Sequence, residues 1–422
     1  MESALTLSTV DRAEQVLFDN EPEIALGLVR GLYGQVLPSS DRGRALAIEV
    51  VCLERLGKHE DAQRIVVDMM REEGDDHAYI LAAGIEFSEL DAPLHAEVFL
   101  RNLCELDPNS SVAWYNLAIA LGREDRFVEA LQAYDRCVAI TPEFSDAHLQ
   151  KAYCQETMDD LPGAAATYRR YLELNPEDGE AWKLLGIVES DQRRFTEAYD
   201  AFRHAVKHTQ EPEDIYFNWA ITAVRNADSE QQRACIDKLQ DIDPEGWRTL
   251  LTRADQEEND GQVWAAWELL GEAFENVLEA ESDDPDDDED ACSYVVSVLL
   301  RFAYRHDMRE HAQEHVLRVF EEQLFTEDVL ESLQALEGRL SNTATSFQVV
   351  LKCAAGGAES YVVYGVSTDD ADEAGRLALS FEERCGPGQE LTLYSIQQLT
   401  SPDEGRIGVY WRSGDLDRPP GA

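Results

Sequence analysis

The sequence has few lysines and a large shortage of positive charge. Only six of its 36 basic residues are lysine, against 85 acidic residues, and the formal net charge at pH 7 is −49. A surface this negative repels the phosphates of DNA, RNA and anionic lipid, so we expect no nucleic-acid binding. It suits basic or apolar partners. Adaptation to high salt, or a GC-rich genome, would give the same composition and stands as an alternative explanation.

Cysteine pairs and long apolar runs are also missing. The eight cysteines contain no CxxC pair, and several fall on apolar helix faces, which predicts free thiols in a reducing cytoplasm. The N-terminus has no basic region before an apolar stretch, so no signal peptide is expected. No apolar run of about 18 residues exists, so no membrane insertion is expected. The sequence therefore predicts a cytoplasmic protein without structural disulfides.

What the sequence does contain is a repeat of amphipathic helix pairs. In residues 111–144, Leu117 and Leu121 share one face of a first helix, and Ala130 and Tyr134 share one face of a second. The pattern begins again every 34 residues, at Gly43, His77, Ser111, Ser145, Gly179 and Glu213. A small residue recurs in each second helix, at Ala62, Ala96, Ala130, Ala164 and Ala198. A proline closes four of the units, at Pro108, Pro142, Pro176 and Pro244.

These units resemble the tetratricopeptide repeat (TPR), a 34-residue helix–turn–helix motif with Trp, Leu, Gly or Ala, Tyr, Ala and Pro at these places. The resemblance implies a mostly α chain with a TPR-like α-solenoid of about eight or nine helix-pair units over residues 1–340. It also implies a non-enzymatic scaffold or adaptor for protein–protein interaction. A chaperone for a secreted or assembling partner is the alternative within the same class.

The pattern changes after residue 340, where β-rich runs replace the helical period. The expected elements follow the order ββαββ, at residues 347–353, 361–367, 369–384, 391–399 and 406–411. This order predicts a small α+β domain over residues 346–412. The tail, residues 413–422, is expected to be disordered.

An acidic insert, residues 281–292, interrupts the repeats. Eight of the ten residues from Glu281 to Asp290 are acidic. Clustered carboxylates can hold Ca²⁺, but the Gly and Glu that an EF-hand loop needs at its sixth and twelfth places are absent. We therefore interpret the insert as a solvated, self-repelling loop.

The sequence also contains an H-x-x-E-H motif, formed by His311, Glu314 and His315. This is the zinc signature of inverzincin peptidases, so a zinc metallopeptidase is the alternative function from a different class. However, Ala312 occupies the packing position of a repeat, which places both histidines on the solvent side of a helix. We therefore predict no metal, no cofactor and no enzymatic activity.

The candidate binding surface follows from the resemblance, because the fifth and ninth residues of each TPR line its concave face. The residues that we expect to contact a partner are Tyr115, Ile119, Leu149, Tyr153, Lys183, Ile187, Phe217 and Ile221. Lys183 alone cannot clamp a C-terminal carboxylate, since the other Lys and Asn residues of chaperone-binding TPR domains are absent. The stripe suits an apolar or amphipathic segment with basic flanks. Alternatively, the superhelix closes on itself or its own C-terminal domain covers the stripe.

Overall fold

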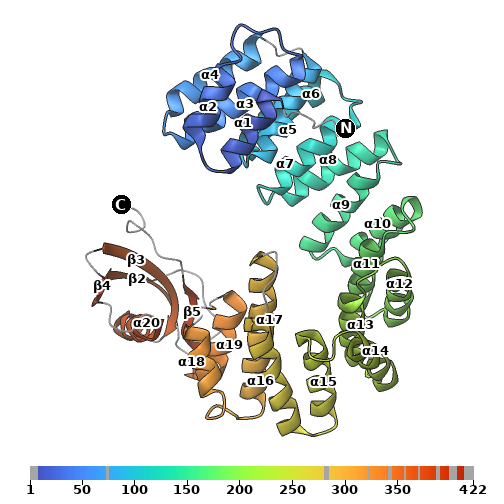
Figure 1. Cartoon of the computed structure of the whole chain (residues 1–422), viewed down its shortest axis with the longest axis vertical. Helices are drawn as coiled ribbons and strands as arrows, with labels where there is room; N and C mark the ends of the chain where they lie inside the picture. The colour runs from blue at the N-terminus through green and yellow to red at the C-terminus, as the bar shows by residue number, and fades with distance from the viewer. Residues whose placement is uncertain are drawn as a thin grey trace, which may run out of the picture. The chain divides into compact units, whose positions relative to one another are not determined.

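The structure is a computed structural model of the 422-residue chain. It describes residues 8–72, 76–279, 285–321, 324, 326–337, 339–340, 345–355, 358–368, 371–385, 390–398 and 406–412. The chain divides into two compact units, Met1–Ile215 and Tyr216–Ala422 (Figure 1). Among the described residues, each hydrophobic core cluster lies within one unit.

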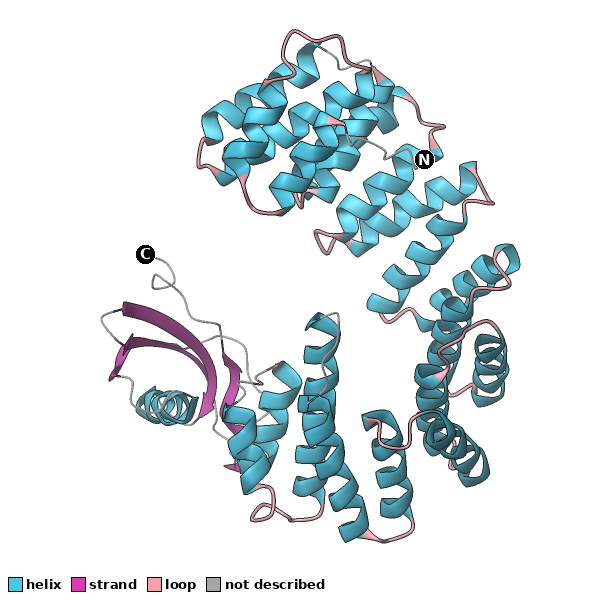
Figure 2. Ribbon diagram, in the orientation of Figure 1, coloured by secondary structure: helices cyan, strands magenta, loops and turns pink. Residues whose placement is uncertain are grey.

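The first unit consists of helix pairs (Figures 1 and 2). Its helices are α1 (Thr9–Phe18), α2 (Pro22–Arg30), α3 (Ser39–Arg55), α4 (His59–Glu72), α5 (His77–Glu89), α6 (Pro93–Leu106), α7 (Ser111–Gly122), α8 (Phe127–Ile140), α9 (Ser145–Thr157), α10 (Leu161–Leu174), α11 (Gly179–Asp191) and α12 (Phe195–Lys207). Helices α5, α7, α9 and α11 begin at the predicted repeat starts, and α3 begins at Ser39, four residues before the expected Gly43. The expectation of a mostly helical, TPR-like solenoid is confirmed.

From the pair α3 and α4 to the pair α15 (Trp247–Asn259) and α16 (Val263–Glu279), the turn inside each helix pair uses one residue with positive φ. These residues recur every 34 positions, at Gly57, Asp91, Asp125, Asp159, Arg193, Ala227 and Gly261. The left-handed conformation reverses the chain in very few residues, and Gly and Asp adopt it more readily than other residues do. The 34-residue period therefore fixes the turns as well as the helices.

Small residues set how closely the two helices of a pair approach. The predicted small positions of the second helices are all buried. A Cβ added at Gly84 would lie 2.7 Å from Leu100, and one at Gly186 would lie 2.6 Å from Phe202. Each glycine thus makes room for a large side chain of the following helix.

The closing prolines also contact the next repeat. The indole Nε1 of Trp114 donates a hydrogen bond to the Pro108 carbonyl at 3.0 Å, and that of Trp182 donates to the Pro176 carbonyl at 2.9 Å. The Trp of the repeat pattern therefore satisfies a carbonyl that follows the preceding helix, where no intrahelical partner exists.

The second unit continues with helices and ends in a sheet. Its helices are α13 (Glu213–Arg225, which begins in the first unit), α14 (Ser229–Ile242), α15 (Trp247–Asn259), α16 (Val263–Glu279), α17 (Pro285–Arg305), α18 (Gln313–Glu321) and α19 (Glu327–Glu337). The interpretation of residues 281–292 as a loop is wrong from Pro285 onward, because these residues open α17. A proline at the first helical position and acidic residues in the first turn both favour a helix start. Residues 281–284 lie outside the described part of the chain.

The C-terminal region holds an antiparallel sheet with one helix against it (Figure 2). Its elements are β1 (Arg339–Leu340), β2 (Thr345–Ala355), β3 (Ala358–Thr368), α20 (Ala371–Cys385), β4 (Glu390–Gln398) and β5 (Arg406–Arg412). The strand order is β1-β5-β3-β2-β4, so the short β1, which the sequence did not indicate, adds an edge strand beside β5.

The helices and the sheet of the second unit share one hydrophobic core. Leu351 and Tyr364 of the sheet and Ala374 of α20 belong to the same buried cluster as residues of α15 to α19. The boundary expected near residue 346 stays a prediction, and residues 413–422 lie outside the described part of the chain. Among the residues that the structure describes, no helix combines the length and the apolar character that a membrane crossing requires.

Candidate functional site

Six of the eight predicted contact residues belong to the first helices of repeats in the first unit, and we call the surface that they are predicted to form the groove face. They come in pairs four residues apart on α7, α9 and α11, and four residues is close to one helical turn. The groove face consists of Tyr115, Ile119, Leu149, Tyr153, Lys183 and Ile187. None of the six is fully buried, and Tyr153 is 37% exposed. The first unit therefore leaves these positions partly open to solvent.

Aromatic residues of the second helices, together with Phe144 just before α9, pack against the two tyrosines of the groove face. The Tyr115 ring lies 4.9 Å from the ring of Phe144 and 6.2 Å from that of Tyr134. The Tyr153 ring meets Tyr168 edge to face at 6.0 Å. Aromatic pairs at such distances are mutually stabilising. The tyrosines are thus positioned before any partner arrives.

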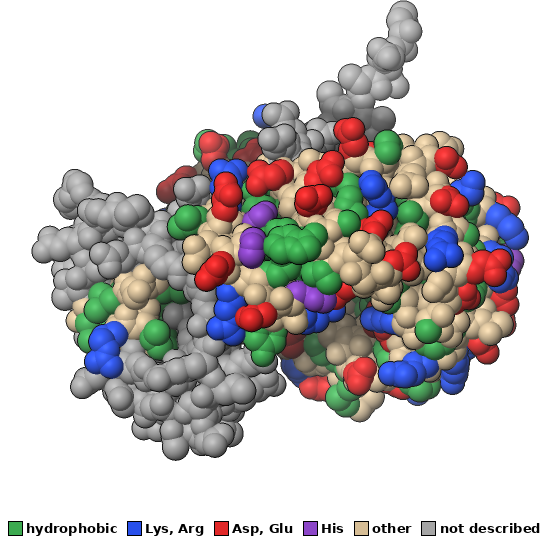
Figure 3. Space-filling view, turned by 90° about the horizontal axis from the view of Figure 1, so that it is seen from below, with side chains coloured by type: hydrophobic (Ala, Val, Ile, Leu, Met, Phe, Trp, Pro, Cys, Tyr) green, Lys and Arg blue, Asp and Glu red, His purple; other side chains and the backbone are tan. Residues whose placement is uncertain are grey.

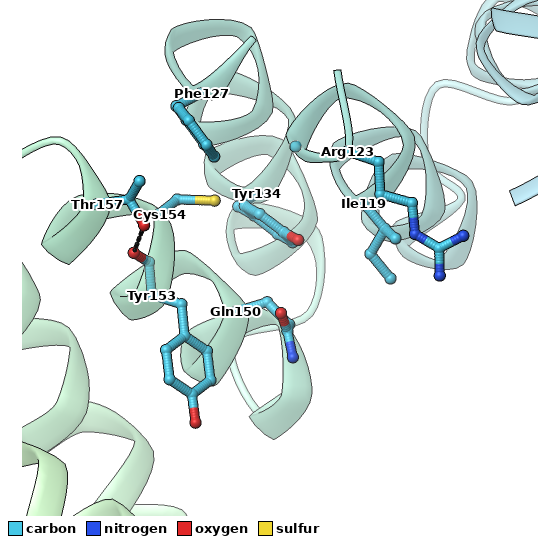
Figure 4. Close-up of a pocket in the computed structure, with 9 residues that line it drawn as sticks. Ile119, Arg123, Phe127, Tyr134, Gln150, Tyr153, Cys154 and Thr157 are labelled. Atoms are coloured by element: carbon cyan, nitrogen blue, oxygen red, sulfur yellow. Dashed lines mark hydrogen bonds between the residues drawn. The ribbon is translucent and has the colours of Figure 1, made fainter. Parts of the chain in front are cut away.

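A pocket of about 430 Å³ opens on the groove face between α7, α8 and α9 (Figure 4). It is lined by Ile119, Gly122, Arg123, Phe127, Tyr134, Gln150, Tyr153, Cys154 and Thr157. In Figure 4, Ile119 and Arg123 lie on one side of Tyr134, and Tyr153 and Cys154 lie on the other. Burial raises the pKa of the Cys154 thiol, so this cysteine stays neutral and contributes apolar surface.

Sequence reasoning found only two of the pocket residues, Ile119 and Tyr153. It missed Arg123 and Phe127 because they belong to the turn and to the start of the second helix, and the fifth and ninth positions say nothing about them. Gln150 follows Leu149 along α9, so the sixth position of this repeat also reaches the pocket.

Carboxylates surround the groove face. Burial raises the pKa of Tyr153, and the charges of Glu180, Glu156 and Asp178 raise it further. Burial likewise raises the pKa of Tyr115, with a further contribution from Asp146. Figure 3 shows, on a face of the molecule seen from below, acidic side chains interspersed with basic and hydrophobic ones. The tyrosine hydroxyls are therefore neutral and lie in a negative field.

Lys183 does not offer a free positive charge on this face. Its Nζ lies 2.9 Å from Glu180 and 3.3 Å from Asp214, and its side chain is only 14% exposed. Burial would lower the pKa of Lys183, but these two carboxylates outweigh burial and raise it. The ammonium is thus paired with two carboxylates of the protein itself, and its predicted role as a partner contact loses its electrostatic basis.

Phe217 and Ile221 belong to the second unit, so the predicted stripe is divided between the two units. Phe217 is 8% exposed, and its ring lies 5.4 Å from Trp247 and 6.1 Å from Tyr294. Ile221 is partly buried against the same core. The expectation that Phe217 presents a contact surface is corrected: side chains of α15 and α17 pack against it.

The H-x-x-E-H motif does not form a helical zinc site of the expected kind. Helix α18 begins at Gln313, so His311 precedes the helix and its exposed ring packs against Trp264 at 4.9 Å. His315 lies 5.2 Å from Trp267, and burial lowers its pKa. The placement of His315 on the solvent side was therefore wrong, because α16 covers it.

Comparison with known proteins gives the same family as the repeat pattern. Two family models, both described as tetratricopeptide repeat, match residues 121–187 and 99–132. The general transcriptional corepressor ssn6 of Schizosaccharomyces pombe is 30% identical over 122 residues, which are 29% of this chain and 11% of that protein. Protein O-mannosyl-transferase TMTC3 of Homo sapiens is 22% identical over 219 residues, which are 50% of this chain and 23% of that protein. This chain thus spans less than a quarter of the length of these two relatives.

Two solved structures, among others, match parts of the chain. The crystal structure of YrrB, described as a TPR protein with an unusual peptide-binding site, has a TM-score of 0.40 and 19% identity, and the match covers 44% of this chain and 95% of that one. The crystal structure of MamA has a TM-score of 0.34 and 19% identity, over 41% of this chain and 95% of that one. Since tetratricopeptide repeat models match residues 99–187 and helices begin at the repeat starts of this motif, the chain contains tetratricopeptide repeats.

Proposed function

We propose that this protein is an interaction scaffold that binds an apolar or amphipathic segment of a partner protein, with basic flanks, on the groove face of the first unit. The observation that carries the proposal is the partly exposed Tyr153 beside an open pocket, surrounded by carboxylates. The proposal concerns binding and not catalysis. It uses only residues of the first unit.

The apolar part of the proposal rests on the pocket. Ile119, Tyr153 and the neutral thiol of Cys154 supply apolar surface, while Gln150 and Thr157 supply a few polar groups. Concave sites of this composition are typical of binding pockets, and about 300 Å³ or more is a typical size. Tyrosine also gives contact area at little cost in conformational entropy, which favours Tyr115 and Tyr153 as anchors.

The basic flanks follow from the charges beside the tyrosines. Glu180, Glu156 and Asp178 act on Tyr153, and the nearby Lys183 is already paired. A lysine or arginine of the partner placed next to an apolar anchor would meet the carboxylates of Glu156 and Asp178, which Lys183 does not pair. Exposed charges are screened by salt, so this contribution should weaken as ionic strength rises.

Capture from an extract of the native host tests the proposal. The Tyr115→Ala/Tyr153→Ala variant should lose the partners that wild type retains, because each anchor is worth about 1–3 kcal/mol of binding. The matched control is Trp264→Ala, which removes an aromatic side chain that is 57% exposed in the second unit. The control should retain the partners.

The outcome also separates the alternative functions. If the double variant is folded by circular dichroism and keeps the same partners as wild type, the proposal fails. If the captured proteins bind only before they have folded, the same surface acts as a chaperone for a secreted or assembling partner. If the control loses partners and the double variant keeps them, the binding surface lies in the second unit.

A further inference from the structure

A second candidate site lies at the N-terminal end of the first unit, where α1, α3 and α5 meet. The guanidinium of Arg44 donates a hydrogen bond to Glu86 at 2.7 Å, to Asp11 at 2.9 Å and to Glu14 at 2.6 Å. Glu89 lies one turn after Glu86 on α5. One positive charge thus faces several carboxylates from two other helices.

Arg44 does not complete this cluster. Glu86 is buried, with a side chain 1% exposed, and Arg44 reaches only its Oε2 atom. Its Oε1 atom is buried and has no hydrogen-bond partner among the described residues. An unpaired buried carboxylate oxygen is costly. The cluster therefore lacks a second positive group beside Glu86.

Three of the carboxylates are close enough to share one ion. An oxygen atom of each of Glu14, Glu86 and Glu89 lies within 4.8 Å of the other two. Two Ca²⁺–oxygen bonds of about 2.4 Å each span that distance. We propose that Glu14, Glu86 and Glu89 form a binding site for a hard divalent cation of the Ca²⁺ class, which supplies the missing charge beside Glu86.

The kind of cation follows from the ligands. All three groups offer carboxylate oxygens, with no imidazole or thiolate, so the site suits Ca²⁺ over zinc or copper. Glu89 is exposed and Glu14 is partly exposed, which leaves room for water as the remaining ligands. Ca²⁺ accepts such irregular mixtures of carboxylate and water, whereas Mg²⁺ demands a near-ideal octahedron and dehydrates reluctantly.

The site would connect parts of the chain that are far apart in sequence. Glu14 lies on α1, while Glu86 and Glu89 lie on α5, in the repeat that begins at His77. A ligand that binds only the folded state stabilises that state. Calcium should therefore stabilise the first unit by holding its first helix against α5.

Titration of the whole, chelator-stripped protein with CaCl₂ tests the site. The titration should be followed by calorimetry in about 0.15 M KCl, which screens exposed acidic residues. We expect one saturable site in wild type and at least about ten-fold weaker binding in Glu89→Gln, since even changes outside the ligand shell cost ten-fold or more. The matched control is Glu105→Gln, an exposed glutamate of α6, which should bind like wild type.

Thermal unfolding at a series of calcium concentrations gives a second measurement, which does not rely on the heat of calcium binding. Calcium should raise Tm of wild type and Glu105→Gln and should raise it less in Glu89→Gln. If Glu86→Gln folds, its Tm should respond to calcium as weakly as that of Glu89→Gln. If Glu86→Gln does not fold, the result for Glu89→Gln alone tests the site. Equal binding and equal Tm shifts in all variants would mean general charge screening and would overturn the proposal, as would no calcium response in wild type.

Discussion

The same repeat position is partly exposed to solvent in the first unit and buried in the second. At the fifth position, Tyr115 in the first unit is partly open beside a pocket, whereas Phe217 in the second unit is 8% exposed. Both are aromatic residues on the first helix of a repeat. They differ in what packs against them, because Trp247 and Tyr294 meet the Phe217 ring. The position in the repeat therefore sets the face of the helix on which a residue lies. The side chains that pack against it set whether it is exposed to solvent and to a partner.

The units also differ in how their cores are built. The core clusters of the first unit contain residues of its helices, whereas in the second unit helices, sheet and α20 share one cluster. A stack of helix pairs leaves one face of its first helices unpacked. The second unit uses further elements to cover apolar surface, which suits a structural role better than a binding one.

The largest expected effect is the difference in stability lost when Phe217 and Tyr153 are each replaced by alanine. Phe217→Ala should lower the free energy of unfolding by about 3–5 kcal/mol, since it leaves a cavity among packed aromatic rings. Tyr153→Ala should lower it by less than about 1.5 kcal/mol, because its side chain is already partly exposed. Urea denaturation of both variants checks this, and similar losses in the two would show that the two positions do not differ in packing.

The second effect is a pH dependence in the second unit. Burial, with a further contribution from Glu258, raises the pKa of Asp255 to about 6, although Arg305 lowers it. The folded state then binds a proton more tightly than the unfolded state, whose carboxyl has its ordinary pKa. Stability should therefore fall as the pH rises from about 4 to about 6, by roughly 2 kcal/mol for a shift of this size.

Unfolding midpoints measured across this range check the Asp255 prediction. Asp255→Asn should flatten that part of the profile for the second unit, because the amide does not titrate. An unchanged profile in Asp255→Asn would show that another group is responsible.

A third effect, of similar size, compares two faces of one helix. On α11, Ile187 lies on the groove face, whereas a Cβ at the adjacent Gly186 would lie 2.6 Å from Phe202. Gly186→Ala should cost about 1–3 kcal/mol through overpacking. Gly122→Ala is the control, because nothing lies within 4 Å of its Cβ position, and it should be neutral or slightly stabilising. Equal effects in thermal unfolding would show that the packing face is not tight.

The sequence predicted the local structure of the repeats closely because a 34-residue period fixes both helices and turns. Helices α5, α7, α9, α11 and α13 begin at the predicted residues. The acidic start of α17 was missed, since a run of like charges reads as a loop even where Pro285 and the first-turn acids favour a helix. The local sequence pattern was thus sufficient to predict where most of the repeat helices begin.

Long-range packing explains the errors at the candidate site. Nothing near Phe217 in the sequence indicates that Tyr294, from α17, packs against it. His315 is covered by Trp267 of α16, and the ammonium of Lys183 is paired with Asp214 of the next repeat. In each case the type of residue was read correctly, and its availability depended on an element elsewhere in the chain.

Hydroxyl-radical footprinting of the whole protein, alone and with a captured partner, tests the central claim most directly. The free protein should be labelled at Tyr153 and at Trp264, and much less at the buried Phe217. The partner should reduce labelling at Tyr115 and Tyr153 and leave Trp264 unchanged. Unchanged labelling of both tyrosines in the complex would contradict the account, because a partner bound elsewhere would leave the groove face open.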